Sequence, residues 1–104
     1  MLLQIERTGS PRGFRLVGEL DASNAGQLWD AISSELDQTG DLTLDLSGLA
    51  FMDSSGIQIL VNAAHGLADH GTLILVSPGP LVRRLLALIP VERLENVRVE
   101  GDEG

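Results

Sequence analysis

Apolar and polar side chains alternate in two short stretches of the first twenty residues. Residues 2–6 and 14–20 both follow the period of two that is typical of half-buried strands. Between them, residues 7–13 contain two glycines and a proline, which favour a turn. The pattern therefore predicts two strands that pair antiparallel.

A helical pattern follows from about residue 24 to residue 38, where apolar positions recur every three or four residues. The predicted buried face carries Ala25, Leu28, Trp29, Ile32 and Leu36. Ser23 or Asn24 is suited to cap the start of this helix, and Gly40 to follow its end. We expect Trp29 to belong to the core rather than to form a platform for a ligand.

The rest of the chain alternates between strand and helix patterns. We predict strands at residues 42–46 and 72–76 and a helix from Ser55 to about Asp69. A third helix is expected to begin at Pro80 and stop at Pro90, and residues 97–99 to add a short edge strand. The apolar positions of the third helix are Leu81, Val82, Leu85 and Ile89. The predicted fold class is α/β, with a mixed sheet of four to five strands, parallel βαβ crossovers and about three helices.

The length of the chain, 104 residues, suits one domain with a single core. A hydrophobic content of 43% is typical of folded globular proteins rather than disordered ones. We therefore expect one domain over residues 1–104, with a frayed and flexible tail at residues 100–104.

Charge and composition exclude several function classes. The formal net charge is −8, and all seven basic residues are arginines, so neither nucleic acid nor an anionic membrane is an expected partner. The chain has no cysteine, which excludes disulfides and thiolate metal sites. No apolar run approaches the roughly 20 residues of a membrane span, so we expect a cytoplasmic protein. No metal site and no cofactor site are predicted.

The run Asp53-Ser54-Ser55-Gly56 lies where the strand pattern gives way to the helix pattern, and therefore at a helix N-terminus. Aspartate and serine are common N-cap residues, so a purely structural role is one interpretation. The other is a regulatory hydroxyl, because free backbone N–H groups and the helix dipole favour a phosphate on Ser54 or Ser55. Residue chemistry alone leaves both interpretations open.

Residues 42–56, LTLDLSGLAFMDSSG, resemble the central signature of STAS domains, and among them the bacterial anti-sigma factor antagonists. Three further segments are similar to other parts of the family pattern: residues 18–21, residues 24–25 and residues 80–86. The resemblance extends over nearly the whole chain. It implies a single STAS-like domain.

The resemblance also implies a function. Such antagonists bind an anti-sigma factor with serine kinase activity, which releases a sigma factor, and the kinase then phosphorylates the second serine of the DSSG run. That residue is Ser55 here, and a metal-dependent serine phosphatase would reverse the modification. The expected partner-binding residues are Asp21, Asp53, Ser54, Gly56 and Ile57. Asp21 could instead only cap a turn, and Asp53 could only cap the helix.

Other functions fit the residues less well. A serine hydrolase needs a base near its nucleophile, but His65 would lie roughly 15 Å along the helix from Ser55, and His70 farther. The G-x-S-x-G elbow and the phosphate-binding G-x-x-x-x-G-K-[ST] loop are both absent, and with one tryptophan and two phenylalanines a glycosidase is not favoured. No enzymatic activity is therefore predicted. The alternatives left open are a STAS accessory or sensor subunit of a transporter or larger signalling assembly, and a scaffold without a switch.

Overall fold

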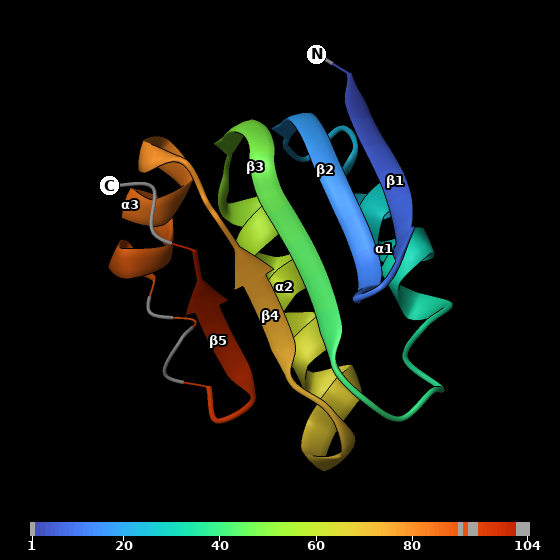
Figure 1. Cartoon of the computed structure of the whole chain (residues 1–104). Helices are drawn as coiled ribbons and strands as arrows, with labels where there is room; N and C mark the ends of the chain where they lie inside the picture. Colours follow the sequence, from blue (N-terminus) through green and yellow to red (C-terminus); the bar gives the residue numbers. More distant parts are fainter. Residues whose placement is uncertain (1, 90, 92–93, 102–104) are drawn as a thin grey trace.

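A five-stranded mixed sheet organises the chain (Figure 1). The computed structural model describes residues 2–89, 91 and 94–101. Its elements, in chain order, are β1 (Leu3–Gly9), β2 (Arg12–Leu20), α1 (Ala25–Ser33), β3 (Leu42–Met52), α2 (Ser54–Leu67), the 3₁₀ helix η1 (Ala68–His70), β4 (Leu73–Val76), α3 (Pro80–Leu88) and β5 (Val97–Glu100).

The strands lie in the order β1-β2-β3-β4-β5. β1 and β2 pair antiparallel, and all the other neighbours are parallel. In Figure 1, α1 and α2 lie together behind the sheet, and α3 lies at the upper left beside the C-terminal part of the chain. This arrangement confirms the predicted α/β fold class, including the antiparallel pair at the N-terminus.

The core lies between the sheet and the two helices behind it. In the first half of β3, the leucines at every second position are almost fully buried, and so are the leucines of β4. This is expected because alternate side chains of a strand point to the same face of the sheet, here the face that packs on the core. The core residues without measurable exposure include Leu16, Leu20, Leu28, Ile32, Leu42, Leu44, Leu67, Leu73 and Leu75. Trp29 packs against this cluster and is partly buried, in agreement with its predicted place.

β3 is much longer than the predicted strand at residues 42–46. Its second half is held by β2 alone, because Gly18 pairs with Leu49 and Leu20 pairs with Met52. β4 is shorter and pairs only with the first part of β3, from Leu42 to Asp45. The prediction was too short because pairing with β2, and not local alternation, sets the length of β3.

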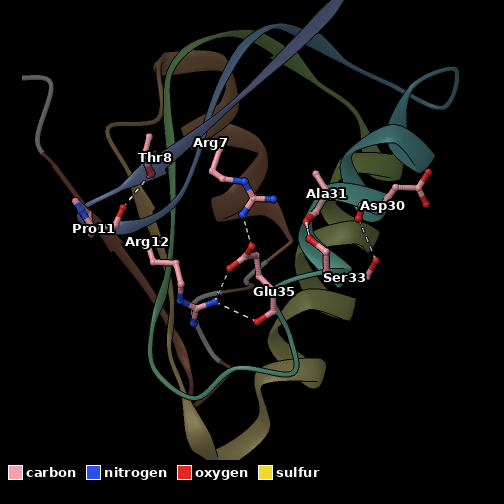
Figure 2. A network of polar contacts seen from close by, with 9 residues as sticks. Arg7, Thr8, Pro11, Arg12, Asp30, Ala31, Ser33 and Glu35 are labelled. Carbon is pink, nitrogen blue, oxygen red and sulfur yellow. Dashed lines mark hydrogen bonds and ion pairs between the residues drawn. The ribbon is translucent and has the colours of Figure 1, made fainter.

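α1 ends at Ser33 rather than near Gln38 as predicted. The hydroxyls of Ser33 and Ser34 donate to the carbonyls three residues earlier, and such bonds compete with the helical ladder. The chain then turns so that Glu35 lies between the guanidinium groups of Arg7 and Arg12 (Figure 2). This ion-pair cluster ends the helix early.

The predicted N-cap of α1 is confirmed in its position, at Asn24, but not as a side-chain hydrogen bond. Asn24 occupies the N-cap position, but its side chain makes no capping hydrogen bond to the helix. Instead its Oδ1 accepts from the N–H of Asp21 at 3.0 Å, and its Nδ2 donates to the carbonyl of Glu19 at 2.9 Å. Asn24 therefore fixes the loop between β2 and α1.

The C-terminal elements differ slightly from the predicted bounds. α2 ends at Leu67, where η1 takes over the last predicted turn. Glu100, expected in the frayed tail, pairs with Val76 as the last residue of β5. The predicted stop at Pro90 and residues 102–104 lie outside the described residues. In the described part of the chain, no helix has both the length and the apolar character needed to cross a membrane.

Candidate functional site

Two parallel strands, β2 and β3, end side by side and bring two predicted site residues to one edge of the sheet. Leu20 and Met52 are register partners, and the N–H of Asp53 donates to the carbonyl of Leu20 at 3.2 Å. Asp21 and Asp53, which directly follow these strands, therefore lie on neighbouring chain segments. The carboxyl ends of parallel strands are a common place for functional groups in α/β folds.

Asp53 caps α2. Its Oδ1 accepts from the N–H of Ser55 at 2.8 Å, and its carbonyl accepts from the N–H of Gly56 at 3.0 Å and of Ile57 at 3.3 Å. The expectation that the backbone N–H groups of this helix N-terminus are free was therefore wrong for Ser55 and Gly56, and the N–H of Ile57 makes the first regular bond of the helix. A phosphate on Ser55 would instead lie beside a carboxylate that already occupies the N-terminus.

The two serines of the DSSG run form the first turn of α2. Ser54 is exposed, whereas Ser55 is partly exposed and its backbone is fixed by Asp53. The turn therefore holds Ser55 in a defined place without enclosing the residue in the core. Exposure by itself does not distinguish the two hydroxyls as acceptors.

Gly56 and Ile57 were expected to contact a partner, but the structure buries both. A Cβ atom on Gly56 would overlap the side chain of Met52 and lie 2.8 Å from Cδ2 of Leu20. Glycine is thus required here because α2 approaches the ends of β2 and β3 closely. This burial favours a supporting role for Gly56 and Ile57 beneath the surface that carries Ser54 and Ser55.

Asp21 is partly exposed and organises the loop after β2. Its Oδ1 accepts from the hydroxyl of Ser23 at 2.6 Å and from the N–H of Ser23 at 2.9 Å. The Ser23 hydroxyl, and then the backbone N–H, hold the pKa of Asp21 below its ordinary value. Asp21 is therefore negatively charged and caps a turn. The turn cap is one of its two predicted roles, and the other is contact with a partner.

The two histidines lie away from the serines. His65 is in the last turn of α2 and His70 ends η1, and both are exposed. Both line a large, open hollow of about 1000 Å³ that also involves Asp41, Glu95 and Asn96. Among the described residues, no group of three or more histidine and acidic side chains is placed to hold a metal ion.

An apolar hollow that the sequence did not predict lies beside the site. A cavity of about 200 Å³ is lined by Phe51, Met52, Leu81, Arg84, Leu85 and Leu88. Leu81 was expected in the core, but it is 60% exposed, whereas Val82 and Leu86 form the buried face of α3. The helical pattern of residues 80–89 offers more than one apolar face, and only the packing shows which face is buried.

Comparisons with known proteins agree with this fold. Residues 3–97 match the family model described as Mlab, STAS domain, so the chain belongs to the STAS domain family. An anti-sigma F factor antagonist of Lysinibacillus sphaericus is 38% identical over 74 residues. This match covers 68% of the chain and 63% of the relative, which is less than two thirds of the relative's length.

Two solved structures of an anti-sigma factor antagonist are similar over nearly the whole chain. The unphosphorylated form of SpoIIAA is 26% identical, with a TM-score of 0.73, and the alignment covers 98% of this chain and 90% of that chain. SpoIIAA from Bacillus in its phosphorylated form is 25% identical, with a TM-score of 0.68, and the coverages are 98% and 93%. The predicted resemblance to the STAS family and its anti-sigma factor antagonists is thereby confirmed. The proteins so named are regulators rather than enzymes.

Proposed function

We propose that this chain is an anti-sigma factor antagonist that acts in the cytoplasm. In its unmodified form it binds an anti-sigma factor serine kinase and so releases a sigma factor. Phosphorylation of Ser55 by that kinase ends the binding, and a metal-dependent serine phosphatase restores it. The chain acts through protein contacts, without enzymatic activity, cofactor, nucleic acid or membrane contact of its own.

The observation that carries this proposal is the position of Ser55. It lies in the first turn of α2, partly exposed, and its backbone is bound by the carboxylate of Asp53. A protein of similar fold, SpoIIAA, has been solved in both phosphorylated and unphosphorylated forms, which supports a switch by phosphate in this family. Asp21, Asp53 and Ser54 are the proposed contact residues, while Gly56 and Ile57 support them from below.

The switch needs only a modest free energy. A phosphate adds roughly −1.5 to −2 charge at pH 7, next to Asp53 in a chain that is already acidic. In the free protein, water can hydrate this charge, but in a complex the phosphate must be buried beside a carboxylate. A tenfold loss of affinity requires about 1.4 kcal/mol, so repulsion and desolvation are sufficient without refolding of the domain.

A phosphotransfer assay tests the proposal. The purified chain is incubated with ATP and, one at a time, with the purified anti-sigma factor kinases from its own genome, and mass spectrometry locates any added phosphate. We expect a single phosphate on Ser55. The Ser55→Ala variant should remain unmodified, whereas the Ser54→Ala variant should be modified like the wild type.

Transfer to Ser54 instead of Ser55 would contradict the assignment of the acceptor. If no kinase modifies the wild type, the proposal as a whole is wrong. Co-purification with a membrane permease would then favour the accessory or sensor subunit.

A further inference from the structure

A small hollow of about 220 Å³ lies on the face of the sheet that α1 and α2 do not cover (Figure 1). Its lining includes residues of the β1–β2 hairpin and of two further strands, and it is called the hairpin hollow below: Thr8, Ser10, Pro11, Thr43, Asp45 and Val76. The leucines that alternate with Thr43 and Asp45 along β3 are buried in the core. Thr43 and Asp45 therefore point to the opposite face of the sheet.

The register of the sheet explains why these side chains meet. Asp45 pairs with Val76, and Gly13 pairs with Thr8 on one side and with Thr43 on the other. Register partners carry their side chains on the same face of a sheet. Gly13 has no side chain to fill the row between Thr8 and Thr43, and a Cβ atom there would overlap the carbonyl oxygen of Thr43. The hollow is therefore a consequence of the close approach of β2 to β3.

The hydroxyl of Thr43 is buried without a hydrogen bond. Thr43 is only 9% exposed, and its hydroxyl has no partner within the part of the chain that the structure describes. By contrast, the hydroxyl of Thr8 donates to the carbonyl of Pro11 at 2.9 Å (Figure 2). Buried hydroxyls are normally paired, and an unpaired one costs free energy. The Thr43 hydroxyl is thus available to a polar group that enters the hairpin hollow.

The charge around the hairpin hollow is negative. Oδ1 of Asp45 accepts from the N–H of Ser47 at 2.9 Å, which orients the carboxylate. Nε of Arg15 lies 3.9 Å from Oδ2 of Asp45, which is longer than a hydrogen bond, and Arg15 also pairs with Glu6 at 3.5 Å. Two carboxylates thus share one guanidinium group, in a chain with a formal net charge of −8. Such a surface favours a cationic ligand.

We infer that the hairpin hollow binds the primary ammonium group of a short aliphatic amine. An ammonium group has three donors and no acceptor, and the hollow offers three side chains with oxygen acceptors, Ser10, Thr43 and Asp45. Pro11 and Val76 supply apolar contacts for the methylene groups of the ligand. A volume of about 220 Å³ equals the share of roughly seven water molecules in the liquid, so the ligand has about seven non-hydrogen atoms.

This site is separate from the switch at Ser55. Asp45 and Asp53 are eight residues apart along β3 and its end, which corresponds to roughly 25 Å in an extended strand. The inference therefore does not rest on the proposed function. It adds a site for a small cation to the domain, and its test needs no kinase.

Amide NMR spectra of the isotope-labelled chain test the inference, with butylamine as the probe. We expect saturable shifts that are confined to the residues around the hairpin hollow, among them Gly13, Thr43, Asp45 and Val76. Butanol has the same length without the charge and should bind at least about tenfold more weakly, because charge-assisted hydrogen bonds are lost. Butyrate, which carries the opposite charge, should not bind.

Three variants locate the contacts. Asp45→Asn removes the charge but keeps an oxygen for the N–H of Ser47, and it should weaken butylamine binding at least about tenfold. Thr43→Val keeps the shape without the hydroxyl and should weaken binding about fivefold. The matched control is Asp30→Asn, which makes the same charge change at an exposed residue of α1 and should bind as the wild type does. Melting temperatures show that each variant is folded.

A further titration distinguishes the source of the ammonium group. A lysine that is capped at both ends presents the same group on a peptide backbone. Tighter binding of butylamine would assign the site to a free amine, whereas equal or tighter binding of the capped lysine would assign it to a lysine of another protein. Both results support an ammonium site.

Three outcomes would overturn the inference. The first is a set of shifts that spread over the acidic surface without saturation, which would mean that butylamine acts only as a counterion. The second is equal binding of butanol and butylamine, which would make the hairpin hollow an apolar cavity. The third is wild-type affinity in both Asp45→Asn and Thr43→Val. If Asp45→Asn does not fold, Thr43→Val and the comparison with butanol decide the question.

Discussion

The two ends of the parallel strands carry charged side chains that are used in opposite ways. At the end where β2 and β3 begin, Glu35 is 6% exposed and lies between Arg7 and Arg12 (Figure 2). Arg12 also donates to the carbonyls of Glu35 at 3.1 Å and of Gly40 at 3.0 Å. The charges of Arg7, Arg12 and Glu35 are paired with one another, and the cluster joins the β1–β2 hairpin to the segment after α1.

At the end where β2 and β3 stop, the acidic groups are left without cations. Within the part of the chain that the structure describes, neither Asp21 nor Asp53 forms an ion pair. Their carboxylates accept from backbone N–H groups and a hydroxyl, which fix their positions without pairing either charge with a described cation. An ion pair within the protein contributes to stability, whereas an oriented carboxylate without a paired cation is available to a partner.

Replacing Glu35 should have the largest effect of the changes considered. Glu35→Ala leaves two guanidinium groups without their carboxylate and should lower the free energy of unfolding by about 2–3 kcal/mol. The matched control is Glu6→Ala, because Glu6 is an exposed partner of Arg15 at 3.5 Å. The control should cost less than about 1 kcal/mol. Equal losses in urea titrations of both variants would remove the contrast between the two ends.

Gly56→Ala should destabilise the fold at the other end by roughly 1–3 kcal/mol, since the added methyl group overlaps Met52 and Leu20. Gly26→Ala is the control, because no atom lies within 4 Å of a Cβ at that position in α1. The control should be neutral or stabilising by about 0.5–1 kcal/mol, as expected for alanine in a helix. Thermal unfolding measures both changes. An unchanged stability of Gly56→Ala would contradict the tight packing of α2 against Met52 and Leu20 at this position.

Ser55→Asp should weaken kinase binding at least about tenfold, which corresponds to about 1.4 kcal/mol, because it adds a carboxylate beside Asp53. Ser55→Ala should bind as tightly as the wild type and should stay bound in the presence of ATP. Both variants should unfold at nearly the wild-type temperature. Equal affinities of the two variants, measured by calorimetry, would count against a switch by charge.

Asp53 allows capping and partner contact to be separated. Asp53→Ala removes the cap of α2 and should cost about 1 kcal/mol of stability. Asp53→Asn keeps an oxygen that can accept from Ser55, so its stability should stay within a few tenths of a kcal/mol of the wild type. If Asp53→Asn still binds the kinase less tightly, the charge of Asp53 contributes to the interface. If its affinity is unchanged, Asp53 acts only as a cap.

The smallest effect concerns pH. Arg7, and then Arg12, hold the pKa of Glu35 below its ordinary value of 4.5, against the opposing effect of burial. A lowered pKa in the folded state means that ionised Glu35 stabilises the fold above pH 4.5, and that this contribution is lost as the pH falls through the folded-state pKa. The difference in unfolding free energy between wild type and Glu35→Ala should thus shrink in acid. A difference that stays constant from neutral pH down into acid would show that ionisation of Glu35 does not contribute.

The sequence by itself determined the features that depend on neighbouring residues. The order of strands and helices, the start of α2 at the DSSG run and the cap by Asp53 all rest on contacts between residues a few positions apart. Local periodicity and capping chemistry report such contacts directly. The family pattern in residues 42–56 pointed to Ser55 as the proposed acceptor, which local chemistry could not choose over Ser54.

Only the tertiary structure decided the features that depend on distant partners. The end of α1 is set by a carboxylate whose partners, Arg7 and Arg12, lie 28 and 23 residues earlier in the chain. The length of β3 is set by pairing with β2, and the exposure of Leu81 and Leu88 by the face of α3 that packs inward. Such features follow from which surfaces meet in space, and residues far apart in the chain leave no periodic signal of their meeting.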